Sequence, residues 1–320
     1  MSNVLEQINK AKRIGITGHI RPDGDCLGAA TALYNYIIDN YPDKSVSIHL
    51  ESVPSCFEYL PGSELVDTDY PDKENYELFI CLDSGDLERI GNSLKYFDKA
   101  DCTVVIDHHI SNIGYGQYNH VVDDASSACE VLFELMDYNK ISYNTAVCLY
   151  TGMIHDTGVF KHSNTSMKTM NIAGKLISKG VPFSRIIDES FYQKTYMQNQ
   201  LLGECLIRSQ LKLDERCIVT VVDKALMESY SATSSDLDGV IDQLRITKGT
   251  EVAVLLHEIG EDTYKVSMRA NNDVNVSVIA QYFGGGGHIK AAGCTLKGEL
   301  DIVLLELMEQ IDIQLKRIYN

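Results

Sequence analysis

The sequence is short of basic side chains and of long apolar runs. Its 320 residues carry 28 Lys and Arg against 45 Asp and Glu, which gives a formal net charge of −17. This deficit of positive charge counts against a protein that coats the phosphate backbone of long nucleic acid, but not against an enzyme that holds a short nucleotide in a local pocket. No stretch reaches about 18 consecutive apolar residues, so we expect no transmembrane helix. The first residues lack the apolar core of a signal peptide, which favours a cytoplasmic protein.

The cysteines lack the spacing of a zinc site or of a disulfide framework. There are nine of them, no two form a CxxC pair, and several lie within apolar runs. An odd number of scattered cysteines is typical of reduced, buried thiols in the cytoplasm. A disulfide framework or a zinc site is the alternative, and the absent spacing argues against both.

Strand-like apolar runs alternate with helical patterns in the first half of the chain. The run at 13–18, for example, is followed by apolar residues at helical spacing over 25–40. This alternation predicts an α/β domain with a mainly parallel sheet and helices on both of its faces. The second half predicts a smaller α+β domain. We place the first domain at 1–185, a helical connector at 186–208 and the smaller domain at 209–320.

Polar side chains gather where the predicted strands of the first domain end. They are His19, Asp23 and Asp25 in one loop, then Asp83, the triplet Asp107-His108-His109, and Asp156 near the end of a helical pattern. The carboxyl ends of parallel strands share one edge of a sheet, where ligands collect in open α/β folds. Taken singly, these are ordinary turn and capping residues, and Asp25 could cap the helix that follows it. Because side chains alternate along a strand, we expect the two adjacent histidines to point to opposite faces.

Together these side chains form a ligand set of carboxylates and imidazoles without cysteine. Such a set suits Mn²⁺, Mg²⁺ or Fe²⁺ better than it suits a structural zinc ion. There are enough carboxylates to hold two divalent ions with one bridging group, which is a common arrangement for displacement at phosphorus. We therefore expect two divalent metal ions at this edge of the sheet, with Mn²⁺ preferred.

The second domain carries a run of glycines. Residues 284–287 are all glycine, His288 follows them, and Arg269 lies in a strand-like run before them. Glycines let backbone N–H groups approach an anion without a Cβ in the way, and Arg269 and His288 would add charged donors. The alternative is a flexible loop, which a glycine run alone would indicate. The adjoining histidine and the Ala-Ala-Gly at 291–293 favour a phosphate-binding site.

Taken in order, these motifs resemble the DHH phosphoesterase family. The motifs of the first domain are His19, Pro-Asp-Gly-Asp at 22–25, Asp83, Asp-His-His at 107–109 and Asp156. The glycines and histidine at 284–288, with Val-Ser-Met-Arg at 266–269 before them, resemble the signature of the associated DHHA1 domain. The motifs span nearly the whole chain, and its length resembles the branch of nanoRNases and pAp phosphatases.

The resemblance implies a role for each of these residues. It implies that His19 and Asp23 bind one metal ion and that the other is bound by Asp25, His108 and Asp156. Asp83 would bridge the two ions, Asp107 would orient the histidine pair, and His109 would act on the reacting phosphate. The implied substrate-binding residues of the second domain are Arg269, Gly285, Gly286, Gly287 and His288.

The resemblance also implies a reaction, in which water activated by two metal ions hydrolyses a phosphoester. We expect nucleoside monophosphates to be released, 3′ to 5′, from oligonucleotides of two to about five units, and 3′-phosphoadenosine-5′-phosphate (pAp) to be dephosphorylated. The alternatives are a phosphodiesterase for cyclic di-AMP or for the linear dinucleotides pApA and pGpG, and, in another class, a non-catalytic nucleotide or metal sensor. We expect short nucleotides as partners, no long duplex and no membrane, and we also consider a homodimer.

Overall fold

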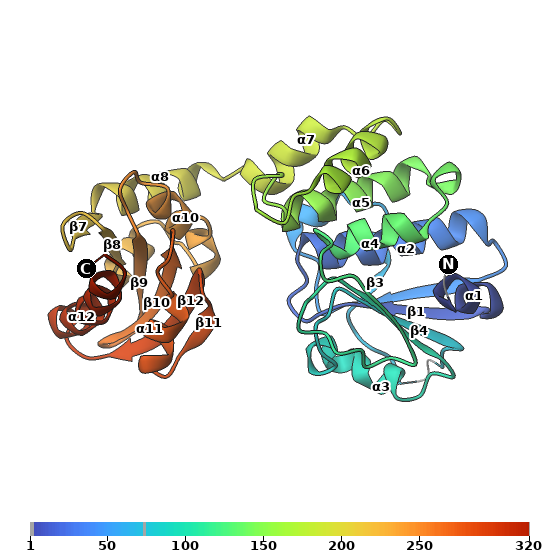
Figure 1. The fold of residues 1–320 in the computed structure, drawn as a ribbon, viewed down its shortest axis with the longest axis horizontal. Helices are drawn as coiled ribbons and strands as arrows, with labels where there is room; N and C mark the ends of the chain where they lie inside the picture. The colour runs from blue at the N-terminus through green and yellow to red at the C-terminus, as the bar shows by residue number, and fades with distance from the viewer. Residues whose placement is uncertain (1–2, 73–74, 320) are drawn as a thin grey trace. The chain divides into compact units, whose positions relative to one another are not determined.

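The computed structural model describes residues 3–72 and 75–319. The chain divides into two compact units, one up to Gln193 and one from Lys194 onward (Figure 1). The region expected to connect the domains, 186–208, is shared between them. Its first residues belong to the first unit, and the helix α8 (Tyr196–Ile207) packs Leu201 and Cys205 into a core of the second.

A six-stranded sheet in which all neighbouring strands are parallel forms the centre of the first unit. Its strands are β1 (Arg13–Thr17), β2 (Ser45–His49), β3 (Val66–Asp67), β4 (Leu78–Leu82), β5 (Thr103–Asp107) and β6 (Tyr118–Val121). Their order is β3-β2-β1-β4-β5-β6, so the chain changes sides between β1 and β4. In open α/β sheets, the crevice at such a switch point is where ligands bind.

Helices cover both faces of this sheet, as the alternating pattern predicts. The helices are α1 (Asn3–Lys10), α2 (Gly24–Asn40), α3 (Leu94–Phe97), α4 (Ala128–Leu135), α5 (Tyr143–Asp156), α6 (Met167–Ile177) and α7 (Phe183–Ile187), followed by a π-helical turn (Asp188–Tyr192). Side chains alternate along β4, so Ile80 joins the large core under α2, α4 and α5, whereas Phe79 joins a smaller core with Tyr96 of α3. The predicted α/β architecture is therefore confirmed.

The second unit is built on a mixed six-stranded sheet in the order β11-β12-β10-β9-β8-β7. Its strands are β7 (Gln210–Lys212), β8 (Cys217–Val222), β9 (Val252–Gly260), β10 (Thr263–Ala270), β11 (Gly286–His288) and β12 (Ala291–Lys297). Only the pair β8–β9 is parallel among the described strands of this sheet. This mixed sheet confirms an α+β second domain.

Helices also lie on both faces of the second sheet. They are α8, α9 (Lys224–Ser229), α10 (Val240–Arg245), α11 (Val276–Tyr282) and α12 (Leu300–Tyr319), with a 3-10 helix at Ser234–Leu237. One core lies under α11 and α12, and the other lies between α8, α9, α10 and the strands β8 and β9. On this second face α10 contacts β8, β9 and β10, and two cavities described below lie beside the polar side of β10.

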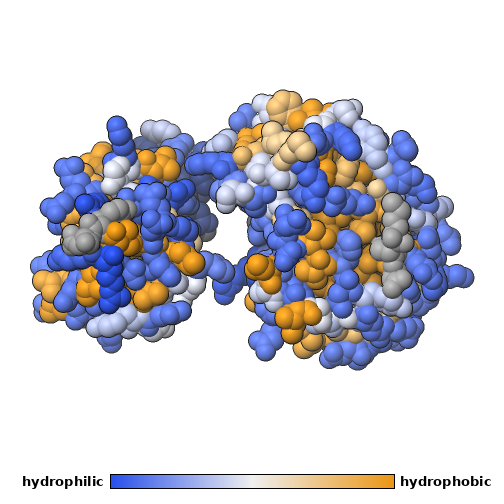
Figure 2. Space-filling view, viewed as in Figure 1, coloured by the Kyte–Doolittle hydropathy of each residue, from blue (hydrophilic) through white to orange (hydrophobic). Residues whose placement is uncertain are grey.

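The surface and the cysteines are ordinary for a globular chain. Figure 2 shows hydrophilic side chains over most of the visible face, with apolar residues exposed in separate groups between them. Seven of the nine cysteines are buried. Within 3–72 and 75–319, no helix combines the length and the apolar character needed to cross a membrane.

Candidate metal centre

The loop after β1 brings His19, Asp23 and Asp25 to the carboxyl edge of the first sheet. Asp23, not Asp25, caps helix α2: its extended backbone precedes the helix, and its Oδ1 accepts the N–H groups of Asp25 (3.0 Å) and Cys26 (3.1 Å). Asp25 lies inside the first turn and is fully buried. The alternative that Asp25 caps the helix is thus wrong, because a residue in the first turn cannot also be the extended residue before it.

Asp25 is instead held by a helix from a distant part of the sequence. Its Oδ2 accepts the N–H of Ala128 (2.6 Å), and its Oδ1 accepts the N–H of Cys129 (3.1 Å), both in the first turn of α4. The free N–H groups of a helix N-terminus favour a carboxylate there. Gly152 of α5 makes room for this contact, since a Cβ at Gly152 would lie 2.6 Å from Asp25 Oδ1.

Asp83 follows β4 and lies between two histidines. Its Oδ2 is 3.5 Å from His19 Nε2, and its Oδ1 is 3.5 Å from His108 Nε2. The side chain is buried, and the backbone has a φ of 50°, a left-handed conformation that is uncommon outside glycine. Each carboxylate oxygen of Asp83 therefore faces a different imidazole.

The Asp107-His108-His109 triplet begins on the last residue of β5. The His108 and His109 rings lie side by side, with centroids 4.8 Å apart. Both approach Asp83 Oδ1, at 3.5 Å for His108 Nε2 and 3.6 Å for His109 Nδ1. The expectation of opposite faces is wrong, because β5 ends at Asp107 and the strand alternation does not extend to the histidines.

Asp156 completes the cluster from the last residue of α5. Its Oδ2 is 3.3 Å from His108 Nε2, and Asp25 Oδ2 is 3.9 Å from the same nitrogen. One ligand atom from each of Asp25, His108 and Asp156 lies within 4.8 Å of the other two. On the other side of Asp83, His19 Nε2 is 3.6 Å from Asp23 Oδ1. The structure thus brings together all six side chains that the sequence suggested as metal ligands.

Hydrogen bonds to backbone carbonyls fix the imidazole tautomers. His19 Nδ1 lies 2.8 Å from the carbonyl of Ile20, and His108 Nδ1 lies 3.3 Å from the carbonyl of Ala125. A carbonyl oxygen only accepts, so Nδ1 carries the proton and Nε2 points toward the carboxylates. Histidine ligands of metal ions are oriented in this way, so the donor set fits divalent cations on both sides of Asp83.

His109 differs from the other two histidines. Its Nδ1 donates to Asp107 Oδ1 (2.8 Å), a buried carboxylate that also accepts the N–H of His108 (2.8 Å). Asn112 donates to the other oxygen of Asp107 (2.6 Å). Since His109 Nδ1 is occupied, its Nε2 is the nitrogen left for a substrate. The ring is also more exposed than that of His108, at 32% against 14%.

The pKa values of the cluster reflect the crowding of buried carboxylates and imidazoles. Burial, together with the neighbouring carboxylates, raises the pKa of Asp156 to about 7 and that of Asp25 well above its usual range. Burial alone would lower the pKa of His19 and of His108, but the surrounding carboxylates outweigh it and raise each to about 10. Carboxylates crowded in a dry site in this way are stabilised by bound metal ions.

Sequence reasoning missed the residues behind the ligands. Asn112 follows the histidine pair by a few residues and donates a hydrogen bond to Asp107, but its position in the sequence does not indicate that role. The Ser-Ser pair at 126–127 before α4 was a capping signal that could have located the turn holding Asp25. Cys26 Sγ was missed as well: it lies near His19 and Asp83 in a buried position, and burial raises the pKa of its thiol well above the usual range.

The glycine run of the second unit is an edge strand and not an open loop. Gly286, Gly287 and His288 form β11 and pair with β12, and the N–H of Gly285 is used by the carbonyl of Ala280 (2.8 Å). A Cβ at Gly285 would lie 2.2 Å from the carbonyl oxygen of Gly293. Gly285 and Gly287 therefore lie too close to β12 for a side chain, whereas Gly286 has open space at its Cβ position.

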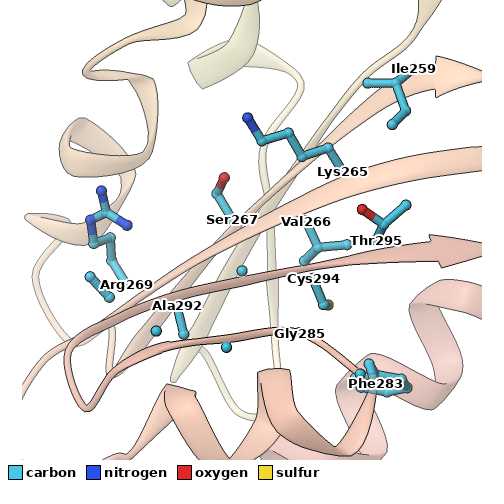
Figure 3. A pocket seen from close by; sticks show the side chains of 15 residues that line it. Ile259, Lys265, Val266, Ser267, Arg269, Phe283, Gly285, Ala292, Cys294 and Thr295 are labelled. Carbon is cyan, nitrogen blue, oxygen red and sulfur yellow. The ribbon is translucent and has the colours of Figure 1, made fainter. Parts of the chain in front are cut away.

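A cavity of about 630 Å³ nevertheless opens beside the run (Figure 3). Arg269 and Gly285, Gly286 and Gly287 line it, whereas His288 is exposed and is not among the lining residues. Arg269 lies 3.5 Å from Asp242, its ion-pair partner on α10. Four of the five substrate-binding residues suggested by the sequence thus share one cavity.

Comparison with known proteins finds both predicted domain types in this chain. Residues 13–153 match the DHH family, N-terminal domain, and residues 214–314 match the DHHA1 domain. The chain is 28% identical over 316 residues to the bifunctional oligoribonuclease and PAP phosphatase NrnA of Bacillus subtilis, which covers 96% of this chain and 97% of that protein. It is 27% identical over 310 residues to the Thermus thermophilus protein of the same name, with 95% and 90% covered.

One solved structure shares the fold over nearly the whole chain. An exopolyphosphatase-related protein from Bacteroides fragilis aligns with a TM-score of 0.89 and 23% sequence identity. The alignment covers 99% of this chain and 96% of that one. At this identity the likeness shows a common fold.

Proposed function

Because the chain belongs to the DHH/DHHA1 family of phosphoesterases, we propose that it hydrolyses short oligonucleotides to nucleoside monophosphates and removes the 3′-phosphate of pAp. Relatives named as bifunctional oligoribonucleases and PAP phosphatases cover nearly its whole length, which supports this substrate class. We further propose 3′-to-5′ release from substrates of two to about five units.

The proposed metal site has two halves that share Asp83. His19 and Asp23 would hold one divalent ion, and Asp25, His108 and Asp156 would hold the other. The single observation that carries this proposal is that each oxygen of Asp83 lies 3.5 Å from a different histidine Nε2. Mn²⁺ is the proposed ion, because imidazole and carboxylate donors without thiolate suit it.

The residues around the ions have separate tasks. Bound divalent ions would supply an activated water and neutralise charge on the phosphoryl oxygens. Asp107 holds the Nδ1 proton of His109, and this hydrogen bond raises the His109 pKa above its ordinary value. His109 Nε2, protonated in this way, donates to the phosphate or to the leaving oxygen. Arg269 and the wall formed by Gly285, Gly286 and Gly287 bind the remainder of the nucleotide in the second unit, with the exposed His288 at the edge of this wall.

The partners follow from the charge of the chain. Short nucleotides meet positive charge only locally, at the metal ions and at Arg269, whereas a net charge of −17 repels long nucleic acid. We also propose that the protein acts in the cytoplasm, does not bind membranes and forms a homodimer. Sedimentation of the purified chain tests the last point, with a single species at the monomer mass as the contrary result.

A substrate panel tests the proposed activity. The full chain with Mn²⁺ is incubated with labelled RNAs of increasing length, pAp, pApA, pGpG and cyclic di-AMP. We expect turnover of the shortest RNAs and of pAp to exceed that of cyclic di-AMP. Faster hydrolysis of cyclic di-AMP, or of pGpG alone, would assign the chain to signalling-dinucleotide hydrolysis instead. Binding without metal-dependent turnover of any substrate would make it a sensor.

A further inference from the structure

A row of polar side chains on β10 separates two cavities of the second unit. Lys265, Ser267 and Arg269 line the 630 Å³ cavity beside the glycine run (Figure 3), and the same three residues line a second cavity of about 330 Å³. The three alternate along the strand with the buried residues Val266 and Met268, so they project from the same face. We call this row the β10 ridge.

The two cavities differ in the chemistry of their far walls. Beyond the ridge on one side are glycine and alanine residues of β11 and β12, together with Phe283. On the other side, Leu237, Ile241 and Leu255 form an apolar floor, and Asp238 and Asp242 lie at its edge. We call this second space the α10 cavity, because α10 supplies part of its wall.

Lys265 and Arg269 give the β10 ridge two positive charges, which favour binding of a phosphate group there. Lys265 is exposed, and its strand neighbours in the register are His257 of β9 and Thr295 of β12. Arg269 lies between two alanines of the same strands, Ala253 and Ala291, which do not crowd its guanidinium. Its Nε faces Asp242 at 3.5 Å, so a phosphate on the ridge would be bound through the Nη groups of Arg269 and through Lys265. An Arg and a Lys on one strand face offer charge-assisted donors to a phosphodiester.

The α10 cavity is unsuited to a phosphate and suited to a nucleoside. The carboxylates of Asp238 and Asp242 repel an anion but accept hydrogen bonds from sugar hydroxyls and from exocyclic amino groups. The floor of Leu237, Ile241 and Leu255 offers apolar contact to a base. A volume of about 330 Å³ is at the small end for a ligand pocket, which limits the occupant to about one nucleoside.

From this arrangement we infer that the second unit binds a dinucleotide step, with the phosphodiester on the β10 ridge and one nucleoside in the cavity on each side. The inference rests on the proposed function and adds a second nucleoside subsite, the α10 cavity, which none of the sequence motifs indicated. It predicts that a trinucleotide gains contacts that pAp cannot make. The occupancy of the α10 cavity would therefore set the preference for oligonucleotides over pAp.

Equilibrium binding without turnover tests this subsite. The full chain in EDTA is titrated into a fluorescent trinucleotide and into a fluorescent mononucleotide, and anisotropy gives each Kd. Ser234→Trp places a large ring at the rim of the α10 cavity, and Ser235→Trp is the matched control, since Ser235 is exposed and lines none of the described cavities. We expect Ser234→Trp to weaken trinucleotide binding about tenfold, the order of one lost base contact, with mononucleotide binding and the control unchanged.

The ridge has its own test in the salt dependence of binding. Lys265→Gln should weaken the trinucleotide and lower the slope of log K against log salt by about 0.7, the value for one lost phosphate contact in a single strand. Equal trinucleotide affinities for Ser234→Trp, Ser235→Trp and the unchanged protein would overturn the α10 cavity as a subsite. So would a wild-type chain that binds the two probes equally. Because these binding measurements contain no metal, they test the subsite independently of turnover. A substrate panel without turnover would refute the proposed activity and leave the binding results unaffected.

Discussion

Replacing Asp107 with asparagine tests whether this buried carboxylate positions His109. Asp107 Oδ1 accepts two donors, His109 Nδ1 and the N–H of His108, and Oδ2 accepts Asn112 Nδ2. An asparagine has one oxygen and one NH₂ group, so at least one donor must face another donor. Fewer hydrogen bonds are lost if the oxygen of the new asparagine keeps the two donors from the histidines and its NH₂ group faces Asn112.

Asn112 cannot relieve this clash by turning its own amide over. Its Nδ2 also donates to the carbonyl of Ser84 (3.0 Å), and its Oδ1 accepts the N–H of Gly114 (2.8 Å). One unpaired buried donor lowers the free energy of unfolding by about 1–3 kcal/mol. Partners that orient residues at a metal site change activity about 10- to 100-fold when they are lost, so we expect kcat to fall by that factor.

Urea unfolding, metal content and steady-state kinetics measure these effects in Asp107→Asn. A positioning role predicts a lower kcat with KM and metal content close to those of the unchanged protein. Asp101→Asn is the control, because Asp101 is an exposed carboxylate near the start of the same strand. The reasoning is refuted if Asp107→Asn keeps its kcat, or if it loses its metal ions and activity together.

Three other perturbations probe the glycines and the metal site. Gly152→Ala should lower the unfolding free energy by about 1–3 kcal/mol and impair metal binding, because the new Cβ would lie 2.2 Å from Cys129 Sγ. Gly174→Ala is the control: it has open space around the new Cβ and should stabilise its helix by up to about 1 kcal/mol. Gly285→Ala should destabilise the second unit through the clash with β12, and Gly286→Ala, with no atom within 4 Å of its Cβ, should not; thermal melts compare the two. Metal binding at pH 8 should release protons, because neighbouring carboxylates raise the pKa of the His19 and His108 imidazoles to about 10. Calorimetry measures this release as a binding enthalpy that changes with the ionisation enthalpy of the buffer. The same binding enthalpy in every buffer would mean that the imidazoles were already neutral.

The location of most of the His and Asp cluster could be predicted from the sequence, because it depends on the topology of the sheet. Parallel strands place their carboxyl ends at one edge, so the polar residues after β1, β4 and β5 had to meet there. Asp156 required more than topology, since it lies at the end of a helix, and the glycines at 152 and 158 and the match to a family motif indicated that it belongs with the others.

The finer geometry depended on contacts between distant segments. Either carboxylate of the Asp-Gly-Asp sequence at 23–25 could cap helix α2. Asp23 does so because Asp25 accepts hydrogen bonds from the N-terminus of α4, about a hundred residues away. Whether His108 and His109 share a face depends on the residue at which β5 ends, which sequence patterns locate only to within a few residues. The glycine run is compatible with a loop, a nest or a strand, and pairing with β12 decides between them.

The central claim is that Asp83 bridges two metal ions, and counting the ions in Asp83→Asn tests it most directly. Asparagine tolerates the left-handed backbone at this position, so the fold should be kept, while the charge shared by the two half-sites is removed. Asp98→Asn, an exposed substitution in the same unit, is the control. Native mass spectrometry with Mn²⁺ should find two ions per chain in the unchanged protein and in the control, and fewer than two in Asp83→Asn, together with loss of turnover. A variant that retains both ions and its turnover would contradict the account.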